Sequence, residues 1–202
     1  MSKHNRRRRA KRQRKIALMT AVAVLVLAFS GLVVWLLSAR APGLIQQSYP
    51  MEYVDVIRQY AAENGLEPAY VAAVILAESS CDPEAVSPAD ARGLMQLLPS
   101  TAEWIAGKFD DGYSEERLFE PELNVRYGCW YLGYLSRRYG GDKRLASAAY
   151  HAGQGNVDKW LQNPEYSPDG ASLSKIPYES TDTYVQRVLR FYEKYSELYA
   201  KI

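Results

Sequence analysis

Residues 68–80 have the sequence PAYVAAVILAESS, an apolar run that ends in a single acid, Glu78. Its leading proline suits the first turn of a helix, so we predict a helix over residues 68–79. Val71, Val74 and Ile75 mark the buried stripe of this helix, and Glu78 follows them at helical spacing. The sequence therefore places a carboxyl group on the same face as apolar side chains.

Two effects favour a protonated Glu78. A carboxyl group that faces apolar surroundings loses hydration when it ionises, which raises its pKa. The carbonyl end of a helix also disfavours a negative charge. A carboxyl group that keeps its proton near neutral pH can act as a general acid. From the helix alone, a glutamate that turns into solvent is the commoner arrangement, and both interpretations stay open at this point.

Charge is divided unevenly along the chain. Residues 1–40 hold ten Lys or Arg and no acid, whereas the whole chain of 202 residues holds 25 bases and 23 acids. The remainder, residues 41–202, therefore has a net charge of −8. An acidic domain is a poor partner for a phosphate backbone, so we expect no nucleic-acid ligand.

The basic head precedes a predicted membrane segment. Eight Lys or Arg lie between residues 6 and 15, and residues 16–37 are apolar and uncharged. As a helix these 22 residues span ~30 Å of hydrocarbon. The positive-inside rule then leaves residues 1–15 in the cytoplasm and exports the rest of the chain, as a single-pass protein of the cell membrane. A cleaved signal peptide is the alternative, because Ala39-Arg40-Ala41 has the form of a cleavage site; the apolar run exceeds the usual signal length of about 7–15 residues, which favours an anchor.

Residues 38–50 are predicted as a linker and residues 51–202 as one mostly α-helical domain. Period-2 alternation typical of strands is nearly missing, while helical patterns recur. Ser100 and Glu103 match a capping box, and Gly140-Gly141 is placed to end a long helix. The predicted helices cover residues 52–64, 68–79, 100–108, 121–139, 143–152 and 181–199.

Cysteine and histidine are scarce. Cys81 and Cys129 both fall in the exported part, where they could form a disulfide or stay as two buried thiols. His4 and His151 lie on opposite sides of the predicted membrane segment, so no histidine metal site is expected. We predict no metal and no cofactor.

Several short motifs follow the helix of Glu78 in a characteristic order. They include Glu78-Ser79, Gly93-Leu94-Met95-Gln96 and Ala149-Tyr150-His151-Ala152-Gly153, with Asn124–Gly128 and Tyr184-Val185 between and after them. This set resembles the catalytic domain of the soluble-lytic-transglycosylase (SLT) family over about residues 52–195. The resemblance implies a lysozyme-like fold related to goose-type lysozyme, acting on the glycan strands of bacterial peptidoglycan.

The resemblance also implies roles for single residues. Glu78 matches the family's one catalytic acid and base, and Ser87 matches a serine that contacts the sugar beside the scissile bond. Met95 and Gln96 match a segment that lines the groove, and Tyr150 matches a tyrosine that faces the catalytic glutamate. Purely structural roles are the alternative: Met95 as core filler, Gln96 as a hydrogen-bonding residue of its loop, and Tyr150 as a core tyrosine.

Two departures from the family pattern bear on the site, while those at Cys81 and Leu98 are interpreted as packing changes. His151 replaces the usual asparagine of the Ala-Tyr-Asn-Ala-Gly motif, where it could keep a hydrogen bond to substrate and add a titratable group. Ser180 takes the place of a family glutamate, and Glu179 lies one position earlier. Ser180 or Thr181 could still cap the last helix.

The implied reaction needs only one carboxyl group. Glu78 protonates the oxygen between N-acetylmuramic acid and N-acetylglucosamine, then takes a proton from the muramoyl C6 hydroxyl, which attacks C1 and closes a 1,6-anhydro ring. A lysozyme-type hydrolase on the same fold is one alternative and would need a second carboxylate. A non-catalytic peptidoglycan-binding or assembly protein is the other.

Overall fold

The computed structural model describes residues 48–110 and 112–200, together with Met19, Phe29, Ser30, Leu32, Val33 and Trp35. Internal contacts divide the chain into two units, residues 1–48 and 49–202. The predicted membrane segment at 16–37 falls almost wholly outside the described residues, as do the predicted tail at 1–15 and most of the linker at 38–50. Within the described part, no helix combines the length and apolar character needed to span a bilayer.

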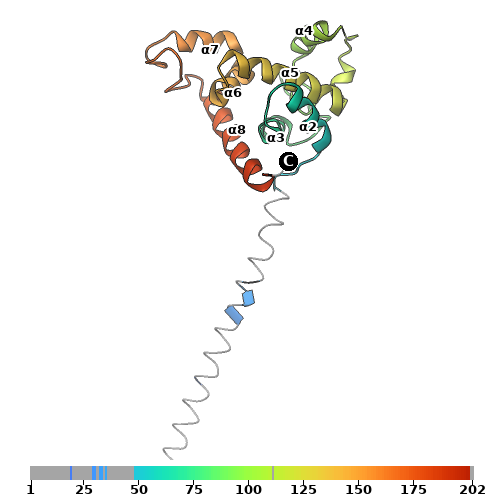
Figure 1. The fold of residues 1–202 in the computed structure, drawn as a ribbon, viewed down its shortest axis with the longest axis vertical. Helices are drawn as coiled ribbons and strands as arrows, with labels where there is room; N and C mark the ends of the chain where they lie inside the picture. The colour runs from blue at the N-terminus through green and yellow to red at the C-terminus, as the bar shows by residue number, and fades with distance from the viewer. Residues whose placement is uncertain are drawn as a thin grey trace, which may run out of the picture. The chain divides into compact units, whose positions relative to one another are not determined.

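The second unit is mostly helical, with loops between the helices (Figure 1). In chain order they are α2 (Val54–Glu63), α3 (Pro68–Ser79), α4 (Pro99–Phe109), the 3₁₀ helix η1 (Glu116–Phe119), α5 (Pro121–Arg138), α6 (Lys143–Ala152), α7 (Gln154–Leu161) and α8 (Glu179–Leu198). Extended pairing in the described part is limited to two isolated antiparallel bridges, Val86 with Arg92 and Arg92 with Leu97. The prediction of a mostly α-helical domain is confirmed.

Helix α3 is the centre of the domain. It packs against α8 and α2, and Figure 1 shows it between them. The predicted stripe of Val71, Val74 and Ile75 is buried, but so are Tyr70, Ala72, Ala73 and Ala77. A helix that is apolar on all sides belongs inside a core. The stripe prediction was therefore too narrow, and the position of Glu78 at the end of this helix is more enclosed than one apolar face would imply.

The predicted capping box of α4 is wrong. The helix begins at Pro99, its N-cap is Leu98, and no side chain caps it. Because proline occupies the first helical position, Ser100 lies inside the first turn, where its hydroxyl is not placed to cap. Glu103 is correspondingly two positions too far along to complete a box.

Helix α8 starts two residues earlier than predicted. Its N-cap is Tyr178, and neither Ser180 nor Thr181 caps it. Thr181 is instead buried, with 1% of its surface exposed. Helix α7 was not predicted, because the glycines at 153 and 155 favour a loop. In the structure Gly153 has a positive φ of +84 and forms the junction at which α6 ends and α7 begins. The predicted stop after α5 is confirmed, since Gly140 and Gly141 both have positive φ.

Two apolar cores meet beneath the predicted site. The larger joins α2, α3, α5, α6 and α8, and the smaller joins α4, η1 and the first half of α5. Tyr131 of α5 and Tyr150 of α6 pack against both cores. Aromatic rings therefore lie where the two cores meet.

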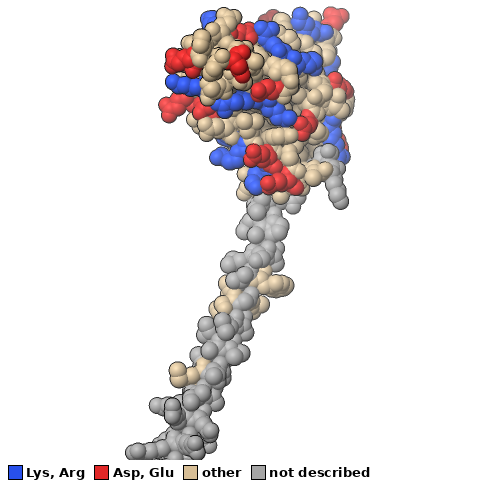
Figure 2. Space-filling model, turned by 60° about the vertical axis from the view of Figure 1, so that its left-hand side comes forward, with Lys and Arg blue, Asp and Glu red and all other residues tan. Residues whose placement is uncertain are grey.

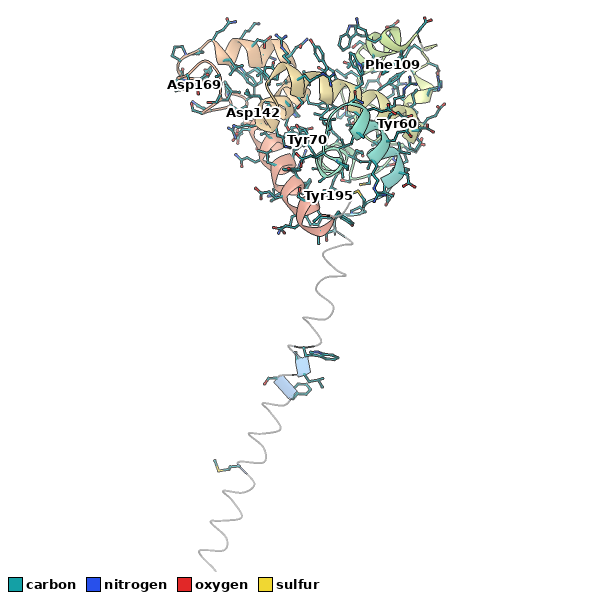
Figure 3. The ribbon with its side chains drawn as sticks, viewed as in Figure 1. Tyr60, Tyr70, Phe109, Asp142, Asp169 and Tyr195 are labelled. Atoms are coloured by element: carbon teal, nitrogen blue, oxygen red, sulfur yellow. The ribbon has the colours of Figure 1, made fainter. Side chains whose placement is uncertain are left out.

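Buried tyrosine hydroxyls connect the helices. Tyr70 of α3 lies 2.8 Å from the Ser147 hydroxyl of α6, and Figure 3 shows it between the two helices. Tyr195 of α8 donates to the carbonyl of Pro50 at 2.7 Å.

Both cysteines are free thiols: Cys129 is buried and Cys81 is partly buried. Acidic and basic side chains are interspersed on the face shown in Figure 2.

Candidate active site

Glu78 lies in the last turn of α3, partly covered by protein. Burial of its carboxyl group raises its pKa to about 7. The hydroxyl of Tyr184, from α8, donates to Oε1 at 2.7 Å. This hydrogen bond and the positive charge of Arg187 favour the ionised form and partly offset burial. The predicted direction of the pKa shift agrees with the structure, and near neutral pH Glu78 can both give and take a proton.

Tyr184 is the residue of the site to which the sequence assigned no role. Only 2% of its surface is exposed. Burial and the negative charge of Glu78 raise its pKa well above the ordinary value, so it remains a neutral donor. The available signal was the buried face of α8, where Val185 and Val188 are also enclosed. A tyrosine on such a face needs a partner for its hydroxyl, and Glu78 is that partner.

His151, at the end of α6, lies against Tyr184. The two ring centroids are 4.6 Å apart with a tilt of 31°. Nδ1 of His151 and the hydroxyl oxygen of Thr181 form a hydrogen bond of 3.1 Å. Burial and the charge of Arg187 lower the pKa of His151 below its ordinary value, so the ring is neutral at neutral pH. The residue that departs from the family pattern therefore packs directly on the hydrogen-bond partner of Glu78.

Tyr150 lies near Glu78, but its hydroxyl binds a loop carbonyl. Its hydroxyl donates to the backbone carbonyl of Met95 at 2.8 Å, whereas the hydrogen bond to Glu78 comes from Tyr184. The negative charge of Glu78 still contributes to a Tyr150 pKa far above the ordinary value, after burial itself. Tyr150 is thus near the carboxyl group but bound to the Gly-Leu-Met-Gln loop.

Met95 is fully buried, with 0% of its surface exposed. Its side chain fills the space above Gly128 of α5, where an added Cβ would come within 2.2 Å of the sulfur. A side chain with no exposed surface cannot touch a glycan, so the structure assigns Met95 to the core and not to the groove lining. Its backbone is what reaches the site, because its carbonyl holds the Tyr150 hydroxyl.

Asn124 of α5 fixes the loop that carries Met95. Its side chain is wholly buried, and its carbonyl oxygen accepts from the Met95 amide at 2.7 Å. Its amide nitrogen donates to the carbonyls of Arg92 and Leu118 at 2.9 and 2.8 Å. Gly93 passes so close that a Cβ there would lie 2.4 Å from this amide nitrogen. Asn124 belongs to one of the motifs in the sequence, but no role was predicted for it.

Gln96 and Ser87 shape the same loop. Gln96, in left-handed backbone conformation at φ +48, donates from Nε2 to the carbonyls of Ala85 and Gly93, both at 3.0 Å. The Ser87 hydroxyl accepts from the amides of Ala89 and Ala91 at 3.3 and 3.0 Å. Gln96 also lines a cavity beside Tyr150. The contacts of Ser87 described here stay within its own loop.

Two cavities meet at His151. One, of about 280 Å³, is lined by Gln96, Leu98, Thr101, Tyr131 and Tyr150 among others. The other, of about 440 Å³, is lined by His151, Glu179, Ser180, Thr183, Tyr184 and Arg187. His151 lines both cavities, and Tyr184, whose hydroxyl donates to Glu78, lines the second. We call the two cavities together the groove. The predicted site residues Gln96, Tyr150 and His151 are brought together here, and Glu179 lines the same groove.

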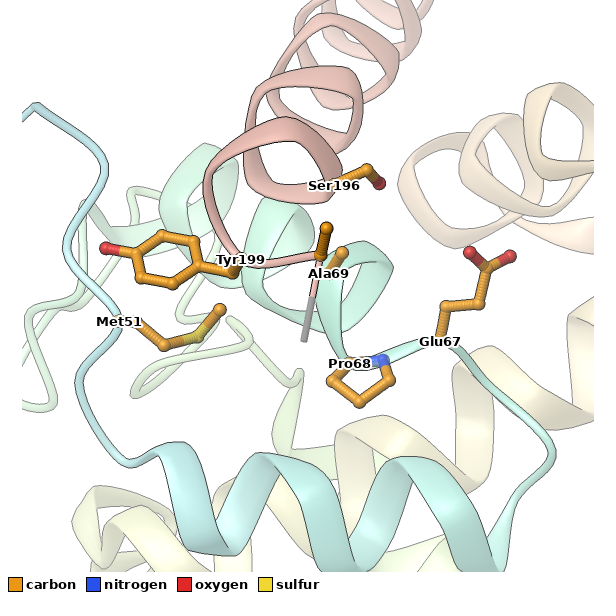
Figure 4. Close-up of a pocket in the computed structure, with 7 residues that line it drawn as sticks. Met51, Glu67, Pro68, Ala69, Ser196 and Tyr199 are labelled. Carbon is orange, nitrogen blue, oxygen red and sulfur yellow. The ribbon is translucent and has the colours of Figure 1, made fainter. Parts of the chain in front are cut away.

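A third cavity lies away from this groove. It has a volume of about 300 Å³ and is lined by residues of α3, α8 and the entry segment, shown in Figure 4. Its carboxylate, Glu67, is paired with Lys143 at 2.7 Å and accepts a hydrogen bond from Tyr192 at 2.6 Å. Those contacts lower the pKa of Glu67, which suits a structural ion pair and not an acid catalyst.

Comparison with known proteins places the domain in a family. A family model described as the transglycosylase SLT domain matches residues 55–171. The soluble lytic murein transglycosylase of Escherichia coli K12 is 35% identical over 150 residues, which is 73% of this chain and 23% of that protein. The membrane-bound lytic murein transglycosylase C of Actinobacillus pleuropneumoniae serotype 5b is 31% identical over 166 residues, covering 71% of this chain and 46% of that protein.

Solved structures give the same result. The 70 kDa soluble lytic transglycosylase of Escherichia coli superposes with a TM-score of 0.69 and 32% identity, over 76% of this chain and 25% of that one. An inactive glutamate-to-glutamine mutant of the lytic transglycosylase Slt from Pseudomonas aeruginosa gives a TM-score of 0.68 and 32% identity, over 76% and 25%. The chain thus spans about a quarter of the length of these soluble relatives. The groove, the loop motifs and these matches together establish that the chain belongs to the transglycosylase SLT domain family.

Proposed function

We propose that this protein is a peptidoglycan lytic transglycosylase with Glu78 as its acid and base. The observation that carries the proposal is a carboxyl group with a pKa of about 7, held by Tyr184 beside a groove. The names of the relatives, lytic murein transglycosylases, support the same substrate. The inactive glutamate-to-glutamine mutant of the Pseudomonas relative supports a single essential glutamate.

The reaction balances on Glu78 alone. Protonated Glu78 gives its proton to the glycosidic oxygen as the bond from C1 of N-acetylmuramic acid breaks. The carboxylate that results then takes the proton of the C6 hydroxyl, while the C6 oxygen bonds to C1 and closes the 1,6-anhydro ring. Glu78 regains its proton, so no water or cofactor enters. Tyr184 stabilises the intermediate carboxylate through its hydrogen bond to Oε1.

The remaining predicted residues have supporting roles in this proposal. Gln96 and His151 face the groove and are proposed to contact the glycan. Tyr150 lines the groove with its ring while its hydroxyl holds the Met95 backbone. Met95 supports the loop from within, and Ser87 is proposed to donate its hydroxyl proton to the sugar, since the backbone amides it accepts from leave that proton free.

One observation favours a second candidate, a lysozyme-type hydrolase. Glu179 at the start of α8 lines the same cavity as Tyr184, so a second carboxylate is available in the groove. A hydrolase would use such a group to activate water and would leave a reducing end. Glu179→Gln distinguishes the two, because it abolishes hydrolysis but leaves formation of the anhydro ring in place.

We also propose that residues 16–37 anchor the protein in the membrane, with residues 1–15 in the cytoplasm and the SLT domain, from about residue 51, outside. The apolar run and its basic flank support this, and the relatives named membrane-bound lytic murein transglycosylase C give it a precedent. A cysteine introduced at the exposed position Ala171 tests the orientation of the domain. In intact cells, after permeabilisation of any outer envelope, it is expected to react with a membrane-impermeant thiol reagent, and reaction only after lysis would contradict the proposal.

Mass spectrometry of digested peptidoglycan tests the activity. The full chain is expected to release 1,6-anhydromuramoyl products, and Glu78→Gln to release none. Reducing ends in place of anhydro ends would establish the hydrolase. Binding to peptidoglycan without any cleavage by the unchanged chain would identify a wall-binding protein instead.

A further inference from the structure

An aromatic cluster extends the groove over α4 and α5. Trp104 of α4 makes edge contacts with Trp130, Tyr131 and Tyr134 of α5, at centroid distances of 5.2, 6.2 and 5.8 Å. Tyr131 and Tyr134 stack on each other at 6.4 Å and 11°. We call Trp104, Tyr131 and Tyr134 the aromatic ledge. Tyr131 also lies 5.4 Å from Tyr150, so the ledge begins at the ring that lines the groove.

Trp104 is unusual because it is exposed. Its side chain keeps 41% of its surface, and it belongs to neither core of the described part of the chain. A large apolar ring left in water marks a binding surface more often when it joins other rings than when it stands alone. Three neighbouring rings hold Trp104 at fixed angles, so little side-chain entropy remains to be lost when a ligand covers it.

The ledge is continuous with the groove along two helices. Leu98 and Thr101 at the start of α4 line the smaller cavity, and Trp104 lies one turn after Thr101 on the same side. On α5, Tyr131 lines that cavity and Tyr134 lies one turn further on. On both helices, the residue one turn beyond the cavity is thus an aromatic ring of the ledge, Trp104 on α4 and Tyr134 on α5.

We propose that the aromatic ledge binds sugar rings of the glycan strand beyond those held in the groove. This inference rests on the proposed function for the identity of the ligand. N-acetylhexosamine rings present apolar C–H faces that stack on aromatic rings, and their polar edges remain in water. The Tyr134 hydroxyl, which donates to Gln154 Oε1 at 3.1 Å, supplies a polar margin of the kind that such edges meet. The ledge would hold a long strand in register while the groove positions the bond to be cleaved.

Two substitutions separate ring stacking from apolar bulk. Trp104→Leu keeps an apolar side chain but removes the flat face, and Trp104→Tyr keeps a ring. Both are made in the full chain carrying Glu78→Gln, so that peptide-free glycan strands used as the probe are not consumed. The dissociation constant for long strands is expected to rise at least about tenfold in Trp104→Leu and to stay within about threefold in Trp104→Tyr. Leu198→Ala, at an equally exposed apolar position at the end of α8, is the matched control and is expected to bind like its parent.

A measurement on the parent protein avoids any effect of substitution on folding. Oxidation of Trp104 by N-bromosuccinimide, followed by peptide mass spectrometry, is expected to slow when long strands are bound. Unchanged oxidation, or Trp104→Leu binding as tightly as its parent, overturns the inference. Cleavage is assayed separately. If the protein forms anhydro products but binds long strands equally well without Trp104, only the proposal for the aromatic ledge is contradicted. If binding depends on Trp104 but the unchanged chain does not cleave, only the proposed activity is contradicted.

Discussion

The hydroxyl of Tyr184 donates a 2.7 Å hydrogen bond to Oε1 of Glu78, joining residues 106 positions apart in the sequence. The bond links the central helix α3 to the last helix α8. Because Oε1 of Glu78 accepts this hydrogen bond, we expect the acidic proton to be carried by Oε2. The family match to residues 55–171 ends before α8, so this half of the arrangement lies outside it.

Removing the Tyr184 hydroxyl is expected to raise the pKa of Glu78 further. That hydrogen bond favours the ionised carboxyl, so Tyr184→Phe should move the alkaline limb of the rate profile up by about one pH unit. The maximal rate should fall, because the carboxylate that accepts the C6 proton loses its donor. A profile of kcat/KM against pH measures both effects. A Tyr195→Phe variant serves as control, since that hydroxyl binds Pro50 far along α8; the same alkaline shift in both variants would contradict the assignment.

Glu78 is expected to destabilise the folded protein at neutral and higher pH. Its folded pKa of about 7 lies above the ordinary 4.5, so the unfolded chain releases the proton first as the pH rises. The free energy that this group contributes to folding is therefore fully present below about pH 4.5, declines between pH 4.5 and 7 and is lost above pH 7. The whole loss is about 3 kcal/mol. Glu78→Gln mimics the protonated state and should raise the unfolding temperature at pH 8 but not at pH 4. Equal unfolding temperatures at pH 8 would show that the carboxyl is well hydrated.

His151 is expected to set the acid limb of activity. Burial and the charge of Arg187 lower its pKa, so it gains a proton at a lower pH than an ordinary histidine. A protonated ring would favour the ionised form of nearby Glu78 and remove the general acid. His151→Asn, which restores the usual family residue, and His151→Phe, which keeps a ring over Tyr184, should both lose this inflection. Retention of the inflection in either variant would contradict its assignment to His151.

The sequence predicted most of the helices well for a physical reason. Prolines at 68, 99 and 121 and glycines at 140 and 141 act locally, so they mark the ends of helices without knowledge of the fold. Partners that lie far apart in the chain could not be found in this way. The pairing of Tyr184 with Glu78 depends on how α8 packs on α3, and no local pattern encodes it.

Met95 illustrates the same limit. Its motif correctly located the loop beside the groove, but the direction of its side chain depends on the space above Gly128 on another helix. The departure at His151 was visible in the sequence, whereas its contact with Thr181 became apparent only once α6 and α8 were placed together.

Loss of the Asn124 side chain is expected to loosen the loop that supports the groove. Asn124→Ala removes three hydrogen bonds and takes away the partner that Asn124 gives to the Met95 amide and to the Leu118 carbonyl. The Arg92 carbonyl still accepts from the Leu97 amide. The free energy of unfolding should fall by about 2–4 kcal/mol. Asn64→Ala is the control, because that side chain makes a single bond near the surface at the end of α2. Chemical denaturation of both variants measures the difference. A smaller loss for Asn124→Ala than for Asn64→Ala would contradict its place as the hub of the loop.

The first residue of the folded domain can be tested by truncation. The Tyr199 hydroxyl donates to the carbonyl of Tyr49 at 2.9 Å, and the buried Tyr195 donates to Pro50 at 2.7 Å. The Tyr49 ring also makes edge contacts with Tyr195 and with Phe191, each at 5.8 Å. A fragment of residues 51–202 loses these contacts and leaves the Tyr195 hydroxyl without an acceptor, whereas a fragment of residues 49–202 keeps them. We therefore expect the longer fragment to be more stable, with a free energy of unfolding about 1–3 kcal/mol larger and a higher unfolding temperature. The groove lies at the other end of α8, so both fragments should cleave peptidoglycan equally well at low temperature. A difference in their activity at low temperature would mean that residues 49 and 50 support the groove as well as the fold.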